Sequence, residues 1–156
     1  MLFYRATTGP RDVSVPMIRM LTATSLVAYP LGALTMALAP ESLATSIAGF
    51  GLILLALICF VPLFGSSIQR VVGEETERLD EYELRLRGRA MSLAYAIFSG
   101  LVLLAVLYSA IAADKGFWFP NTYEQFNGVF WGVFLYASIL PAALLSWLVD
   151  PSFNQE

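Results

Sequence analysis

Residues 90–113 read AMSLAYAIFSGLVLLAVLYSAIAA, and this stretch, which has no charged side chain, decides the fold. A helix of about 20 apolar residues crosses the hydrocarbon core of a bilayer, which is about 30 Å thick. A helix on the surface of a soluble bundle would need a polar face, and this stretch has none. We therefore expect residues 90–113 to form a transmembrane helix.

Three more blocks of similar length and composition lie along the chain. Residues 43–64 and 128–149 carry no charge, and residues 17–38 carry only Arg19, close to the start of the block. Helices are the only open-ended structures that satisfy their own backbone groups in lipid. The sequence therefore predicts an all-α polytopic membrane protein, with one membrane domain over residues 1–156. Its four spans are expected at 17–38, 43–64, 90–113 and 128–149, arranged as two helical hairpins.

The overall composition excludes several classes of function. Of the 156 residues 58% are hydrophobic and only 13% are charged, whereas soluble domains carry about 25% charged residues. The net charge of −3 argues against nucleic acid as a partner. The chain has no histidine and a single cysteine, Cys59. We therefore expect no disulfide, no metal site, no required cofactor and no catalytic residues.

The basic residues predict the orientation in the membrane. Eight of the nine lie before or within the first block, or between the second and third; the ninth is Lys115, between the third and fourth. Short loops rich in Lys and Arg stay on the cytoplasmic side. We therefore expect both chain ends and the central loop in the cytoplasm of a bacterium, with the chain in its inner membrane.

Tryptophans near the ends of the expected spans are candidate interface anchors, because their rings prefer the headgroup level. These residues are Trp118, Trp131 and Trp147. Residues 114–127, rich in aromatic side chains, are expected to lie flat on the outer interface. The same segment is also suited to docking a partner, and the two roles are compatible.

The one strongly polar segment is residues 74–89, in which acidic residues precede basic ones. Its apolar residues recur at steps of three or four, which is typical of a helix. We expect the third helix to begin near Glu74 and to extend into the cytoplasm as a stalk over residues 74–89. The stalk would dock either phospholipid headgroups or a partner protein. Its candidate docking residues are Glu81, Glu83, Arg85, Arg87 and Arg89.

Residues 79–90 of this segment read LDEYELRLRGRA. This string resembles an L-D-E-x-E-x-x-L-R-x-R-A segment of small inner-membrane proteins of proteobacteria, in which the segment also leads into a transmembrane helix. The resemblance covers this segment and the hydropathy profile. It implies a bacterial inner membrane and brings no activity with it.

Glycines at helix-packing positions are candidate contact residues. Gly128 and Gly132 are four residues apart in the fourth block, and Gly49 lies among small residues in the second. This spacing lets helix backbones approach closely. Such contacts fit either the chain's own helices or a helix of another subunit.

Two prolines lie inside expected helices, Pro30 in the first and Pro141 in the fourth. Each removes a backbone hydrogen bond and is expected to kink its helix. A kink can open a groove for a lipid, a quinone or a carotenoid. The side chains expected to line such a groove are Tyr29, Tyr136 and Trp131.

The expected spans carry no ionisable side chain away from their ends, and ion-coupled transport depends on such groups. The sequence therefore predicts a non-catalytic accessory or assembly subunit of a larger inner-membrane complex, respiratory or photosynthetic. It would act by helix packing and through the charged stalk, with other integral membrane subunits and phospholipids as partners. The alternative is a transporter of small molecules or lipids that works as a homo-oligomer.

Overall fold

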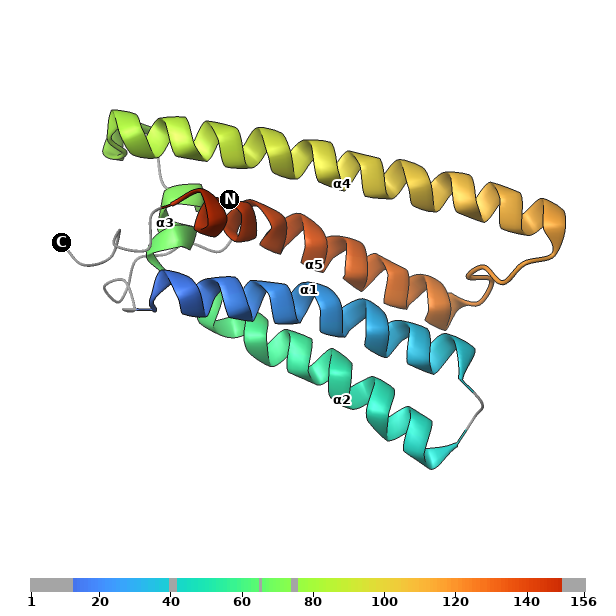
Figure 1. Cartoon of the computed structure of the whole chain (residues 1–156). Helices are drawn as coiled ribbons and strands as arrows, with labels where there is room; N and C mark the ends of the chain where they lie inside the picture. The colour runs from blue at the N-terminus through green and yellow to red at the C-terminus, as the bar shows by residue number, and fades with distance from the viewer. Residues whose placement is uncertain (1–12, 40–41, 65, 74–75, 150–156) are drawn as a thin grey trace.

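The computed structural model describes residues 13–39, 42–64, 66–73 and 76–149, and these ranges are helical almost throughout (Figure 1). Four helical segments are long and apolar enough to cross a membrane: Val15–Leu38, Leu43–Leu63, Glu81–Lys115 and Tyr123–Leu148. The second of these joins α2 to the short helix that follows it. This confirms the all-α class and the four apolar helices. In chain order the elements are α1 (Val15–Leu38), α2 (Leu43–Phe60), the 3₁₀ helix η1 (Val61–Leu63), α3 (Ser67–Gly73), the 3₁₀ helix η2 (Thr76–Arg78), α4 (Glu81–Lys115) and α5 (Tyr123–Leu148).

Local sequence signals set where the long helices begin. The hydroxyl of Ser42 accepts a hydrogen bond from the Thr45 backbone N–H, and the Thr45 hydroxyl accepts one from the Ser42 N–H, which forms a capping box at the start of α2. At the start of α5 the Thr122 hydroxyl accepts a single hydrogen bond, from the N–H of Gln125. These polar caps satisfy backbone donors that a helix start leaves without partners.

The start of α4 corrects the expected stalk. The Asp80 carboxylate accepts a hydrogen bond from the Glu83 N–H at 2.6 Å, and Asp80 itself is extended, with φ −72° and ψ 171°. An extended N-cap residue cannot belong to a continuous helix, so a new helix starts after it: α4 begins at Glu81 and not near Glu74. Glu74 itself lies outside the described residues.

The four long helices lie in an open row in the order α4, α5, α1, α2 (Figure 1). The helices α1 and α2 form one antiparallel hairpin, α4 and α5 form the other, and the two hairpins meet along α1 and α5. The short helix α3 packs against α5 and α4. It lies where the long helix α1 begins and α5 ends, at one end of the helix axes (Figure 1). We call this end of the molecule, which carries Arg19, Arg70 and Glu83, the charged end.

The buried core gathers at the charged end. Ile18 of α1, Ile68 of α3 and Ile139 and Leu145 of α5 are each completely buried. By contrast, α4 buries few of its residues: Leu86, Ala90, Ala94 and Ala112. Most of the rest of α4 is exposed, so one side of this helix has no partner within the described chain.

Candidate functional site

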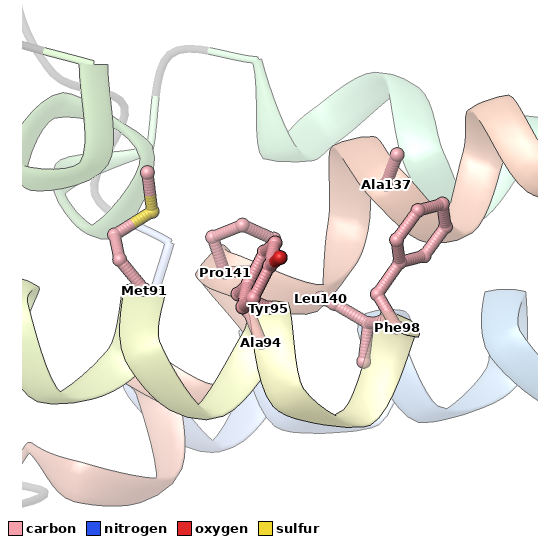
Figure 2. Close-up of a pocket in the computed structure, with 7 residues that line it drawn as sticks. All are labelled: Met91, Ala94, Tyr95, Phe98, Ala137, Leu140 and Pro141. Atoms are coloured by element: carbon pink, nitrogen blue, oxygen red, sulfur yellow. The ribbon is translucent and has the colours of Figure 1, made fainter. Parts of the chain in front are cut away.

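A groove lies between α4 and α5, about halfway along α5 (Figure 2). Its volume is about 180 Å³, and it is open on one side. The only polar side-chain atom in its lining is the hydroxyl of Tyr95, whose side chain is 75% exposed. The lining residues are Met91, Ala94, Tyr95 and Phe98 from α4, and Ala137, Leu140 and Pro141 from α5.

Pro30 lies within α1, which continues through it as helix. Proline has no N–H, so the carbonyl of Leu26, four residues earlier, loses its usual backbone donor. The hydroxyl of Tyr136, on α5, donates to this carbonyl at 2.6 Å. A side chain of the neighbouring helix therefore replaces the hydrogen bond that Pro30 removes.

Pro141 lies within α5, and it leaves the carbonyl of Ala137 without its usual donor in the same way. No side chain of the described residues donates a hydrogen bond to that carbonyl. Both Ala137 and Pro141 line the groove. The acceptor that lacks its usual donor therefore belongs to a residue of the groove wall.

The side chains that sequence reasoning placed in such a groove lie elsewhere. The Tyr29 hydroxyl donates to the Gly128 carbonyl at 2.7 Å, and Tyr136 is bonded to Leu26, so both hold α1 and α5 together. Trp131 is half-exposed and makes edge contacts with Phe130 and Phe134. None of the three lines the groove between α4 and α5, and both tyrosines are used in the α1–α5 contact.

The three candidate packing glycines occupy different surroundings. A Cβ atom on Gly132 would lie 3.0 Å from the Tyr29 ring, whereas one on Gly128 would meet open space. Gly49 lies against α1, where a Cβ atom would come within 3.1 Å of the Gly32 carbonyl oxygen. Gly49 and Gly132 thus lie at helix contacts within the chain.

Arg19 links the start of α1 to the end of α5. Its Nε donates to the Ser146 carbonyl at 2.8 Å and its Nη2 to the Val149 carbonyl at 2.9 Å. Its guanidinium also lies 5.0 Å from the centre of the Trp147 ring. The last carbonyls of a helix lack intrahelical donors and attract positive charge, so Arg19 caps α5. Sequence reasoning used Arg19 only for orientation, although a charge inside an apolar block pointed to a bonded role.

The five candidate docking residues do not form one cluster. Glu83, whose side chain is 12% exposed, forms an ion pair at 2.7 Å with Arg70 and so fastens α3 to α4. Glu81, Arg85 and Arg89 are exposed, and Arg87 is half-buried. Arg85 and Arg89 are four residues apart and share one side of α4, whereas Arg87, two residues from each, lies on a different side.

The segment expected to lie flat, 114–127, is helical at its two ends and non-helical over residues 116–122. α4 continues to Lys115 and ends at Gly116, whose φ of 69° is left-handed and suits glycine. α5 then begins at Tyr123. Between them, the Trp118 carbonyl accepts a hydrogen bond from the Tyr108 hydroxyl at 2.7 Å, which ties this connection back to α4.

No protein-family model matches the chain, and no curated protein or solved structure shows significant similarity to it.

Proposed function

We propose that this chain is a non-catalytic accessory or assembly subunit of a larger membrane complex, respiratory or photosynthetic, in a bacterial inner membrane. The observation that carries the proposal is the one-sided packing of α4. This helix rests on α5 and α3 along Leu86, Ala90 and Ala94, and its opposite side has no partner within the described chain. An unpartnered helix at the edge of an open row is suited to joining a neighbouring subunit.

The free side of α4 has the composition of a helix-packing surface. Ser92 is two residues from both Ala90 and Ala94 and therefore lies about 160° around the helix from them. Small residues recur on its side at every fourth position: Gly88, Ser92, Ala96 and Gly100. A Cβ atom on Gly88 or Gly100 would meet nothing within 4 Å. Small residues at this spacing let a second helix approach closely in a membrane.

The charged end supports the proposal of an accessory or assembly subunit. Glu81 and Arg85 are exposed at the start of α4, one turn apart, next to the small-residue side. With both chain ends in the cytoplasm, as the basic residues favour, these side chains meet either phospholipid headgroups or the cytoplasmic end of a partner helix. The partners proposed are other integral membrane subunits.

Ala96→Leu tests this proposal, with Ala105→Leu as the matched control. Ala105 is nine residues further along α4 and lies on the side of Ala90 and Ala94, but at a position where that side is exposed. The chain, tagged at its C-terminus, would be purified in mild detergent and its stoichiometric partners identified. We expect Ala96→Leu to lower partner recovery at least tenfold and Ala105→Leu to leave it unchanged.

Recovery of the chain alone, as a symmetric oligomer that neither variant disturbs, would contradict the proposal. That result would favour the alternative of a homo-oligomeric transporter. Equal loss of partners in both variants would show that the bulk of leucine, and not its position on α4, is responsible.

A further inference from the structure

The two prolines create the same chemical defect in two different surroundings. At Pro30 the freed carbonyl of Leu26 receives the Tyr136 hydroxyl at 2.6 Å. At Pro141 the helix opposite is α4, which presents Ala94 and Phe98 to the groove. Where α5 supplies a hydroxyl donor to α1, α4 leaves a groove of about 180 Å³.

An acceptor in apolar surroundings is costly when no donor reaches it. In the first case a side chain of the neighbouring helix supplies the donor, and in the second the carbonyl belongs to Ala137, a residue of the groove wall. A ligand that carries an O–H group into this groove would complete the hydrogen bond. A ligand with only carbonyl oxygens would leave it incomplete.

The position and lining of the groove select the kind of ligand. Ala137 lies near the middle of α5, which spans Tyr123–Leu148, whereas Met91 on the α4 side is two residues from Arg89. The groove therefore extends from near the charged end toward the middle of α5. Its apolar lining offers no charged partner to a phospholipid headgroup, whereas it suits a ring attached to an apolar tail. An apolar cavity of about 150 Å³ holds a benzene ring.

The walls of the groove suit an aromatic ring. Figure 2 shows the rings of Tyr95 and Phe98 along the α4 side, with the Met91 thioether at one end. Aromatic rings and a thioether make favourable contacts with a flat ring. We propose that the groove between α4 and α5 binds a hydroquinone with an apolar tail, whose hydroxyl donates to the Ala137 carbonyl.

The proposal is tested by binding of two matched probes, decylubiquinol and decylubiquinone, to the purified full-length chain in detergent under anaerobic conditions. Equilibrium dialysis gives the two dissociation constants. Only the quinol has O–H groups, so we expect it to bind about fivefold more tightly, as one additional neutral hydrogen bond implies.

Pro141→Ala is the decisive variant. The new alanine would supply the missing N–H to the Ala137 carbonyl, so the preference for the quinol should disappear while the quinone binds as before. Pro30→Ala is its matched control, since the same change falls in α1, which supplies no residue of the groove lining, and it should keep the fivefold preference. Ala137→Phe, at an exposed position of the groove wall, should weaken both probes at least tenfold.

Three results would overturn the inference. The first is equal affinity of the parent chain for the two probes, or uptake of both without saturation. The second is a quinol preference that survives Pro141→Ala. The third is displacement of the quinol by dodecanol at equal concentration, which would show that any hydroxyl-bearing amphiphile occupies the groove and that the ring contributes nothing.

Discussion

The two hairpins of this molecule are built from similar helices but are packed differently. In the α1–α2 hairpin the backbones touch: a Cβ atom on Gly32 would lie 2.7 Å from the Gly49 carbonyl oxygen. The Ser25 hydroxyl of α1 also donates to the Ala56 carbonyl of α2 at 2.9 Å. In the α4–α5 hairpin a groove separates part of the two helices.

The difference shows which hairpin holds the fold and which offers surfaces. α1 makes polar contacts on both sides, to α2 through Ser25 and to α5 through Arg19 and Tyr29. α4 is packed along one side only. The first hairpin together with α5 therefore forms the rigid part, and changes there should cost more stability than equivalent changes on α4.

The largest loss of stability is expected from Gly32→Ala. The new Cβ atom would lie 2.7 Å from the Gly49 oxygen and 3.0 Å from the Ile53 nitrogen, both backbone atoms that cannot turn aside. We expect the free energy of unfolding to fall by about 3 kcal/mol, the upper part of the range for overpacking. Unfolding of the purified chain in mixed micelles with increasing SDS measures this change.

Gly100→Ala supplies the matched comparison on α4. A Cβ atom at this position meets nothing within 4 Å, and alanine favours a helix more than glycine does. Stability should stay the same or rise slightly. If the two variants lost equal stability, the distinction between a rigid hairpin and a loosely packed one would not hold.

Sequence reasoning predicted the long helices well, because uncharged blocks of sufficient length leave few alternatives in lipid. It predicted the helix ends less well. The expected helix start near Glu74 depended on periodicity and on the order of acidic and basic residues, whereas in the structure α4 begins at Glu81, after the capping side chain of Asp80. A cap depends on the conformation of a single residue, which hydrophobic periodicity does not register.

The candidate site was predicted only in kind. The prolines indicated a groove, and one lies at Pro141. Its lining could not be read from the sequence, because this depends on which helices are neighbours. In the open row α5 lies against α1, so the Tyr136 hydroxyl donates to the Leu26 carbonyl and does not reach the groove lining.

A smaller loss is expected from Arg19→Ala, which tests how the first hairpin is joined to α5. The change removes two charge-assisted hydrogen bonds to the carbonyls of Ser146 and Val149. We expect a loss of about 2 kcal/mol in the same unfolding measurement, since Arg19 is only partly buried. Arg85→Ala, an exposed arginine on α4, should cost less than about 0.5 kcal/mol.

Arg19→Lys separates the charge from the geometry. Lysine keeps the positive charge near the end of α5 but lacks the planar fork that reaches two carbonyls at once. The free energy of unfolding of Arg19→Lys should lie between those of the parent chain and of Arg19→Ala. A lysine variant as stable as the parent would mean that charge alone joins the two elements.

The smallest effect is expected from Tyr136→Phe, which compares the two prolines directly. The change leaves the Leu26 carbonyl without either donor, at a cost of about 1 kcal/mol. Tyr95→Phe, on the half of the groove that α4 provides, removes a hydroxyl that forms no hydrogen bond within the described chain and should cost almost nothing.

A double-mutant cycle with Pro30→Ala shows whether the hydroxyl acts by replacing the bond that the proline removes. The alanine in that variant would supply a backbone N–H to Leu26, so Tyr136→Phe should cost much less in that background than in the parent chain. We expect a coupling free energy of about 1 kcal/mol. Additive effects would mean that Tyr136 stabilises the α1–α5 contact by packing alone, and that a carbonyl freed by a proline in this fold does not need a replacement donor.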